Sequence, residues 1–279
     1  MEKIKIITDS TADLPQEVID KYDIEVLPLI VNINDKPYLD IVDIKLPELL
    51  RIMDEEKIFP TTSQVTPQRF YDCYKKYLEE GYKIVSIIMS SKMSGTYQSA
   101  CIAKEMLETS DIVIIDSLNV TSGLGVLVIK ACKLREQGLN INEIEQKIIE
   151  TIPHVKSALA FERLDNLVKG GRLSKTAGAI GNILGIKLIL EVKDGEMAIM
   201  DKVRGSKKAV RVINDYVNEK GIAKGETSIL LHVGETDILP ALREKVSEEE
   251  SEFIECEVGC VVGTHSGSAA AGIFFIENY

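Results

Sequence analysis

Tryptophan is absent from this sequence, and aromatic residues make up only 5% of its 279 residues. Hydrophobic residues nevertheless reach 45%, which is the ordinary proportion of a globular protein. The core must therefore be built mainly from isoleucine, leucine and valine. A cavity lined by such a core would suit a hydrocarbon chain better than a flat ring system.

Positive charge is in deficit, since 33 Lys and Arg face 44 Asp and Glu and leave a formal net charge of −11. A general nucleic-acid binder needs clustered Lys and Arg for phosphate contacts, so that class is disfavoured. Electrostatic docking to an anionic membrane is disfavoured for the same reason. Long apolar runs are missing too, and no segment approaches the roughly 18 residues of a membrane span. We expect no stable membrane insertion.

Cysteine and histidine are sparse. The five cysteines are scattered, their number is odd, and the apolar run at the N-terminus is broken at Thr8. These features predict no secretory signal and reduced thiols in the cytoplasm. Cys256 and Cys260 lie near His265, but about four ligands at usable spacing are needed for zinc. We therefore expect no metal and no cofactor.

Familiar catalytic motifs are also missing. The stretch GGRLSK at 170–175 lacks Gly-Lys-Ser/Thr at the offset of a phosphate-binding P-loop. No G-x-G-x-x-G follows a predicted strand, and no G-x-S-x-G elbow or Ser-His-Asp order is visible. The sequence thus offers hydroxyl donors and aliphatic walls without an obvious reaction.

Short β-branched runs alternate with helical patterns in the first half. Strands are predicted at 3–10, 24–33, 83–89 and 111–117, and helices at 43–55, 66–81, 96–108, 120–138 and 140–153. Within 24–33, Pro28 implies a sheet edge or a bend. Continuous apolar strands alternating with helices indicate a parallel sheet covered on both faces. We therefore predict an N-terminal α/β/α domain at residues 1–155.

The second half mixes hairpins and helices, which predicts a C-terminal α+β domain at 156–279. Asp194-Gly195 is the turn signal of a hairpin formed by 186–192 and 197–203. Further strands are predicted at 157–161, 227–234, 253–262 and 272–277, and helices at 163–171, 206–221 and 238–250. The segment 175–185 is expected to be helical, with Gly178, Gly181 and Gly185 on one face, either for close packing or as a groove for an apolar chain.

Three hydroxyl-rich turns follow predicted strands, at Thr8–Thr11, Ser90–Thr96 and Asp116–Gly123. Ligands bind at this edge of an open parallel sheet, although serine, threonine and aspartate also cap helices. For the three turns together we expect some convergence on a ligand. Thr61, Thr62 and Ser63 are expected on a loop before a helix, where they either serve as turn residues or join this site.

His265 is expected just after a strand, among glycines and small hydroxyl residues. There it could donate a hydrogen bond to an anion or simply bond a loop carbonyl. The helix predicted to begin at Thr96 would turn its free N–H groups and favourable dipole toward an anion, and Gly95 permits close backbone approach. The candidate ligand-binding residues are Thr61, Thr62, Ser63, Ser94, Gly95 and His265.

Six motifs in order along nearly the whole chain resemble the DegV family of fatty-acid-binding proteins, which includes the acyl carriers of the bacterial fatty acid kinase. They are KIITDSTADLP, PTTSQVTP, SSKMSGTYQSA, LDNLVKGGRLSK, GIKLILEVKDGE with KVRGSKKAV, and VVGTHSG. The resemblance implies a two-domain α/β fold with one long-chain fatty acid, such as palmitate, buried between the domains. It also implies that Thr62 and Ser94 bind the carboxylate, with His265 close to the head group.

The resemblance further implies a carrier that presents the carboxylate to a partner kinase for acyl phosphate formation and does not catalyse the transfer. A basic group would then dock the kinase or its nucleotide, unless its members are ordinary solvated side chains; it comprises Arg172, Lys175, Arg204, Lys207 and Lys208. The alternatives are an enzyme acting on a small carboxylate or phosphate, and a regulatory sensor that responds to lipid.

Two departures from the family pattern stand out. Ser268 and Ala269 replace proline and glycine after the G-T-H motif, which could reshape the turn beside His265. Leu188 replaces the proline of an I-K-P motif.

Overall fold

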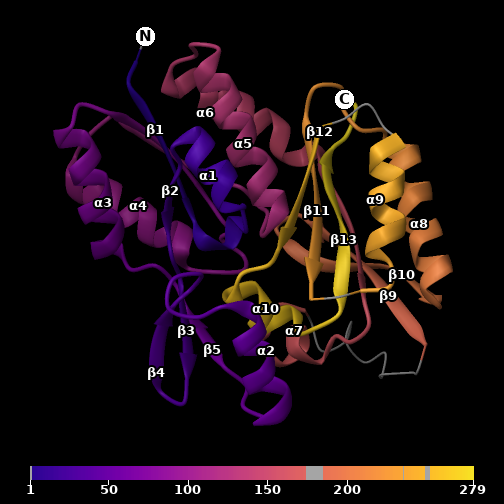
Figure 1. Cartoon of the computed structure of the whole chain (residues 1–279). Coiled ribbons are helices and arrows are strands. Elements are labelled where there is room, and N and C mark those ends of the chain that lie inside the picture. Colours follow the sequence, from indigo (N-terminus) through magenta and orange to yellow (C-terminus); the bar gives the residue numbers. More distant parts are fainter. Residues whose placement is uncertain (1, 174–184, 235, 249–251) are drawn as a thin grey trace.

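The computed structural model describes residues 2–173, 185–234, 236–248 and 252–279. Within them the chain forms three sheets (Figure 1). The predicted helix 175–185 lies outside the described residues except for Gly185, and so do Gly178 and Gly181.

The first sheet is four-stranded, entirely parallel and ordered β2-β1-β6-β7. Its strands are β1 (Ile4–Asp9), β2 (Glu25–Leu27), β6 (Lys83–Ile88) and β7 (Ile112–Asp116). The helices α3 (Pro67–Glu79) and α4 (Thr96–Leu107) cover one face, and α5 (Ser122–Glu136) and α6 (Ile141–Thr151) cover the other. The short helices η1 (Ser10–Ala12) and α1 (Gln16–Tyr22) follow β1. The parallel α/β/α architecture predicted for the first half is confirmed.

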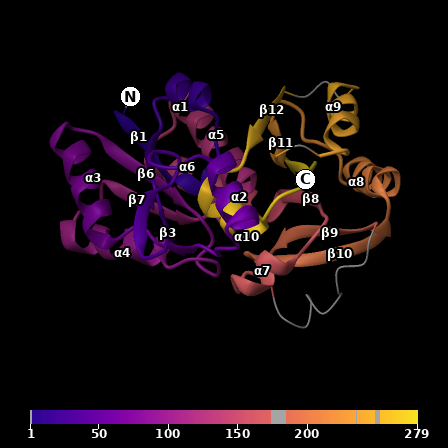
Figure 2. The ribbon, with the colours of Figure 1, turned by 60° about the horizontal axis from the view of Figure 1, so that its bottom comes forward.

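The second sheet has six strands in the order β10-β9-β8-β13-β11-β12. These are β8 (Val155–Phe161), β9 (Ile186–Lys193), β10 (Glu196–Arg204), β11 (Thr227–Val233), β12 (Glu252–Glu257) and β13 (Ala270–Ile276). All neighbouring pairs are antiparallel except β11 and β12. The helices α8 (Ser206–Lys220) and α9 (Leu239–Glu248) cover the outer face (Figure 2). This mixed sheet with helices is the α+β arrangement expected of the second half.

A small antiparallel sheet, ordered β4-β3-β5, was not anticipated. It comprises β3 (Ile30–Ile33), β4 (Lys36–Leu39) and β5 (Thr61–Ser63). The run 24–33 is split at Pro28, so β2 and β3 belong to different sheets, as a bend there implied. The predicted loop at Thr61–Ser63 is wrong, because these residues pair with β3. The helix α2 (Leu46–Glu55) lies between β4 and β5 in the chain.

The predicted strand at 253–262 is also wrong in its second half. The strand β12 ends at Glu257, and the helix α10 spans Cys260–Ser266. His265 therefore lies in the last turn of a helix and does not directly follow a strand. In Figure 1 α10 lies in the lower middle of the molecule, beside α2 and α7 (Asp165–Lys169), and it contacts both. The short helix η2 (Ile152–His154) precedes β8.

The helix α5 holds the two large sheets together. It contacts β1 and β6 of the parallel sheet and β8, β11 and β13 of the mixed sheet. Apolar side chains on all sides of it are buried, including Leu124, Val128 and Leu134. A helix buried all round forms part of a core. Because it joins the two halves, one core cluster contains residues of both sheets. A domain division at residue 155 remains a prediction.

Candidate functional site

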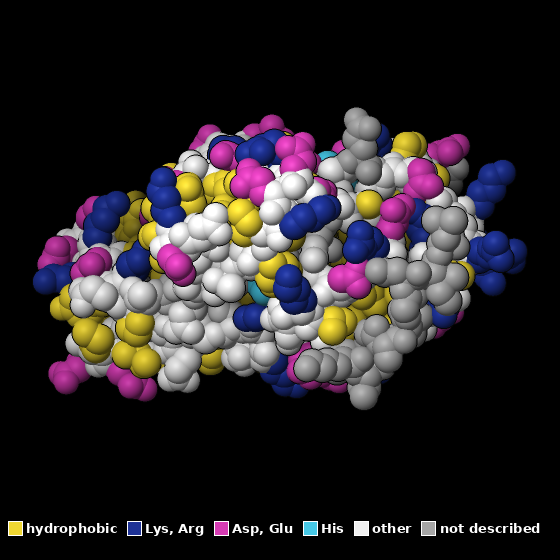
Figure 3. Space-filling model, turned by 90° about the horizontal axis from the view of Figure 1, so that it is seen from below, with side chains coloured by type: hydrophobic (Ala, Val, Ile, Leu, Met, Phe, Trp, Pro, Cys, Tyr) yellow, Lys and Arg dark blue, Asp and Glu magenta, His cyan; other side chains and the backbone are white. Residues whose placement is uncertain are grey.

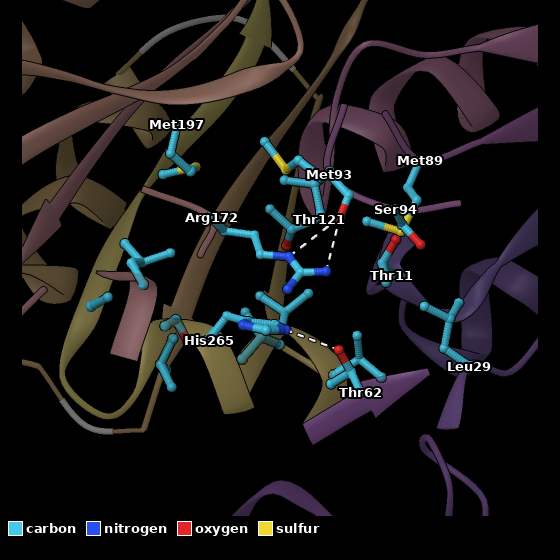
Figure 4. A pocket seen from close by; sticks show the side chains of 18 of the residues that line it. Thr11, Leu29, Thr62, Met89, Met93, Ser94, Thr121, Arg172, Met197 and His265 are labelled. Atoms are coloured by element: carbon cyan, nitrogen blue, oxygen red, sulfur yellow. Dashed lines mark hydrogen bonds between the residues drawn. The ribbon is translucent and has the colours of Figure 1, made fainter. Parts of the chain in front are cut away.

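A cavity of about 170 Å³ lies between the parallel sheet and the inner face of the mixed sheet (Figure 4). Most of its wall is apolar and is supplied by Leu29, Met89, Met93, Val120, Leu159, Phe161, Leu167, Met197, Leu231, Val233, Val258, Val261, Val262, Ala270 and Ala271. Aliphatic and methionine side chains predominate, as the composition suggested. Such a wall favours a flexible hydrocarbon over a polar solute.

The three hydroxyl-rich turns converge on this cavity. Thr11, Ser94 and Thr121 each contribute one lining side chain, from η1, from the turn before α4 and from the residue before α5. Other hydroxyls of the same turns have structural partners. Thr8 donates to the carbonyl of Ile87, and Ser90 donates to the carbonyl of Gly195 at the tip of the β9–β10 hairpin.

Thr62 and His265 form a polar contact in the wall of the cavity. The Oγ1 of Thr62 lies 3.0 Å from Nε2 of His265. Ser63 and Gln64 also line the cavity, whereas Thr61 is exposed and does not. On a strand, successive side chains point to opposite faces. Thr61 and Thr62 therefore face opposite ways, while Ser63, exposed like Thr61, lines the cavity from the last residue of β5.

Two buried carboxylates hold α10, and thereby His265, in place. Asp40 accepts hydrogen bonds from the backbone N–H groups of Cys260 (2.7 Å) and Val261 (3.3 Å), and Asp13 accepts one from Gly259 (2.7 Å). Their other oxygens accept from the hydroxyls of Ser10 and Thr121. Burial raises the pKa of both carboxyls. These bonds satisfy N–H groups that a helix start leaves unpaired.

The His265 ring is half-buried and tightly packed on one side. Burial, with a smaller contribution from the charge of Arg172, lowers the pKa of His265 to about 4. The imidazole is therefore neutral near pH 7. Its Nδ1 is buried and has no hydrogen-bond partner among the described residues. A Cβ at Gly170 would lie 2.2 Å from that nitrogen, so only glycine leaves room for the ring there.

Arg172 also lines the cavity, which the sequence did not suggest. Its guanidinium donates to the carbonyl of Met93 through Nε (3.3 Å) and Nη2 (3.1 Å), and to that of Gly170 through Nη1 (2.6 Å). These bonds turn the side chain inward, beside Thr121 and above His265 in Figure 4. The cation thus stands at the polar end of an otherwise uncharged cavity.

Ser94 and Gly95 lie at the start of α4, as the sequence predicted. Gly95 is the N-cap residue, and the N–H of Thr96 donates to Oγ of Ser94 at 3.2 Å. A Cβ at Gly95 would lie 2.1 Å from Oε1 of Gln64, so a larger residue there would have to displace the end of the Gln64 side chain. The sequence did not point to Gln64 and Ser266, which line the same cavity, whereas Thr11 and Thr121 belong to two of the turns that it expected to converge.

The other members of the predicted docking group lie elsewhere. Arg204, Lys207 and Lys208 are exposed where β10 leads into α8, and Lys175 is outside the described residues. Seen from below, the face of the molecule mixes Lys and Arg with Asp and Glu, and a histidine reaches its surface (Figure 3). The role of Arg204, Lys207 and Lys208 in docking a partner remains a prediction.

The described residues do not complete a catalytic triad around the Thr62–His265 pair. Thr62 and His265 could pair as nucleophile and base, but no carboxylate of the described residues orients the ring through Nδ1. The described residues contain no group of three His, Cys, Asp or Glu able to hold a metal ion. Within the same residues, every helix is too short or too polar to cross a membrane.

Comparison with known proteins identifies the family. A family model described as an uncharacterised protein of the DegV family matches residues 3–278. A DegV domain-containing protein of Clostridium acetobutylicum is 71% identical over 279 residues, which is the full length of both chains.

Solved structures share the fold. A fatty-acid-binding DegV family protein from Thermus thermophilus superposes with a TM-score of 0.91 at 29% identity, covering 99% of this chain and 100% of that one. A protein from Eubacterium ventriosum, described as binding stearic acid, gives 0.85 at 26% identity and covers 99% and 98%. The matched fold and the six motifs agree, and the chain belongs to the DegV family.

Proposed function

We propose that this protein binds one long-chain fatty acid and presents its carboxylate to a partner kinase for acyl phosphate formation. The observation that carries the proposal is one cavity with an aliphatic wall and a polar end formed by Thr62, Ser94, His265 and Arg172. Relatives of the same fold are described as fatty-acid-binding proteins. The apolar wall takes the acyl chain and the polar end takes the carboxylate.

The wall supplies most of the affinity. Burying about 14 methylenes at about 0.8 kcal/mol each contributes about 11 kcal/mol before the costs of association. Hydrogen bonds to a charged carboxylate add about 1.5–3 kcal/mol each. The polar groups therefore fix the direction of the ligand more than its total affinity.

His265 and Thr62 have different roles at the carboxylate: the histidine orients the threonine, and the threonine contacts the ligand. With the proton on Nε2, the neutral imidazole donates to Oγ1 of Thr62, and the threonine hydroxyl is free to donate to the carboxylate. This tautomer leaves Nδ1 unprotonated, so no N–H is buried at that nitrogen without an acceptor. The Arg172 guanidinium adds a favourable charge, and the start of α4 adds its N–H groups and dipole.

In this proposal the phosphoryl transfer occurs on the partner, because the described site holds no general base with an orienting carboxylate. The partner kinase itself is inferred from the family resemblance. Arg204 and Lys207, exposed on an acidic protein, are the cations assigned to docking. All five cysteines are free thiols, which supports a cytoplasmic protein.

The test begins with mass spectrometry of ligand extracted from freshly purified protein. A co-purified long-chain fatty acid supports the carrier, and turnover of a small carboxylate by the protein alone would support an enzyme instead. Titration of delipidated protein with palmitate follows. We expect the double variant Thr62→Val with Ser94→Ala to bind at least about tenfold more weakly, since two bonds to a charged group are lost. Thr61→Val, on the exposed side of the same strand, is the control.

The proposal fails if no fatty acid is found and none binds. The kinase step has its own test, in which the loaded protein is reconstituted with a fatty acid kinase and ATP. Charge reversal at Arg204 and Lys207 should lower acyl phosphate formation without changing fatty-acid affinity. Unchanged formation would remove the docking role, and binding without any transfer would favour a lipid-responsive sensor.

A further inference from the structure

The inner face of the mixed sheet carries three successive rows of side chains across β8, β13 and β11. Each strand contributes one residue to a row, and the rows are Phe161–Ala270–Val233, Leu159–Gly272–Leu231 and Ser157–Phe274–Ile229. The first row follows α10 and precedes α7 in the chain, so it lies nearest the polar end. Each further row is about 7 Å deeper, because a strand rises about 3.3 Å per residue.

The cavity extends along the first two rows and stops at the third. Residues of the first and second rows line it, and Gly272 in the middle of the second row adds no side chain of its own. Phe274 and Ile229 do not line the cavity and are completely buried. The third row therefore fills the space that a longer cavity would need.

The first turn of α5 packs against the third row from the side opposite the sheet. Thr121, just before the helix, lines the cavity. A Cβ at Gly123 would lie 2.9 Å from Cδ1 and Cε1 of Phe274, and one at Gly125 would lie 3.2 Å from Cδ1 of Ile229. The helix backbone thus packs directly on these two side chains, and the two glycines allow this approach.

We propose that Phe274 and Ile229, packed against Gly123 and Gly125 of α5, form the end wall of the cavity and set the longest acyl chain that it accepts. This inference rests on the proposed function, since it takes the occupant to be a fatty acid with its carboxylate at Thr62. The wall is made by side chains that no ligand touches until the chain is long enough to reach them.

The acyl chain could instead run toward the sheet edge at β10, and this path gives a competing prediction for the residue that limits its length. Met197 on β10 pairs with Val192, whose N–H donates to Oγ of Ser157 in the third row. Met197 lines the cavity and is half-buried, on the side away from Leu29 in Figure 4. If the acyl terminus turned toward this edge, Met197 would set the length instead.

The test measures affinity for a series of saturated fatty acids from C12 to C22 with delipidated protein. For the wild type, affinity should rise by about fourfold per buried methylene until the chain reaches the end wall, and then stop rising. Phe274→Leu should move this break point to chains about two or more carbons longer, since it opens space toward the next 7 Å level of the sheet. Ile229→Val should move it in the same direction by less.

Phe275→Leu is the matched control. It is the same substitution at the next residue of β13, equally buried, but on the outer face against Tyr216 of α8. It should leave the break point unchanged. A shift with Met197→Ala and none with Phe274→Leu or Ile229→Val would overturn the end wall. If Phe274→Leu does not fold, the break point measured for Ile229→Val tests the end wall by itself. Failure of the proposed function is separate, because the wild type would then bind none of the acids.

Discussion

Thr62 and His265 are 203 residues apart in the chain, yet Oγ1 of one lies 3.0 Å from Nε2 of the other. One comes from a three-residue strand and the other from the last turn of a seven-residue helix. Neither element would be stable alone, because short helices and strands depend on tertiary packing. The Thr62–His265 pair therefore exists only when the N-terminal and C-terminal segments are assembled.

The first prediction concerns acid stability. The imidazole of His265 has a pKa of about 4 in the folded protein, against an ordinary value of 6.5. Between these pH values the unfolded chain binds more protons, so this contribution to stability is complete above about pH 6.5 and is lost as the pH falls toward 4. The loss should be about 2 kcal/mol, allowing for solvent that reaches the half-buried ring.

Urea unfolding at pH 7 and pH 4.5 of wild type and His265→Gln measures this loss. The buried carboxyls Asp9, Asp13 and Asp40 titrate in both proteins, so their contribution cancels in the comparison. The glutamine variant should lose less stability than the wild type on acidification. An equal loss in both proteins would mean that His265 is not the group responsible.

The second prediction concerns the space behind the His265 ring. Gly170 has φ −75°, a backbone conformation that alanine adopts without strain. Gly170→Ala should nevertheless weaken fatty-acid binding by about tenfold, because the new methyl group would displace the imidazole from Thr62 and remove a hydrogen bond of about 1.5 kcal/mol. Calorimetric titration with palmitate measures the change.

A double-mutant cycle that combines Gly170→Ala with His265→Ala separates this mechanism from a general effect on the fold. In the His265→Ala background, Gly170→Ala should cost almost nothing, since no ring remains to be displaced. A tenfold loss in both backgrounds would place the effect elsewhere.

The third prediction concerns the turn after α10. Ala269 has φ +61°, in the left-handed region that favours glycine. It occupies a position where the family pattern has glycine. Ala269→Gly should stabilise the protein by about 0.5–1 kcal/mol, because relief of the strain exceeds the added entropy of the unfolded chain. Thermal unfolding should show a higher Tm.

Ala271→Gly is the comparison, since Ala271 is in the extended strand β13. There the same substitution should destabilise. If both variants lowered the Tm, the strain at Ala269 would be too small to matter.

The fourth prediction concerns the anchoring of α10. Asp40→Ala would leave the buried N–H groups of Cys260 and Val261 without an acceptor. It should destabilise the protein by about 3 kcal/mol, the cost of more than one unsatisfied buried donor. Asp40→Asn keeps one oxygen acceptor and should cost less. Asp43→Ala, which removes one exposed bond to the N–H of Leu39, is the control. Denaturant unfolding compares the three.

The parallel sheet was predictable because its signals are local. The strands β1, β6 and β7 are β-branched runs that end in turn residues, and the helices between them carry recognisable ends, such as Thr66 before Pro67. The hairpin of β9 and β10 was equally clear, since Asp194 and Gly195 both adopt the positive φ that its turn requires.

The helix α10 was missed because its cause is not local. Cys260, Val261 and Val262 favour a strand by propensity, and the helix forms where Asp40 and Asp13, more than 200 residues away, accept its first N–H groups. The inward turn of Arg172 was missed for the same reason. Its partner, the Met93 carbonyl, is 79 residues distant.

The burial of α5 between the two sheets has a consequence for dissecting this protein into pieces. A fragment ending near residue 155 would keep the helix but lose β8, β11 and β13, against which the helix packs. Leucine, valine and glycine surfaces would then face water, and exposed apolar patches of this kind promote aggregation. Expression of either half alone should therefore yield insoluble material, whereas co-expression of both should restore a soluble pair.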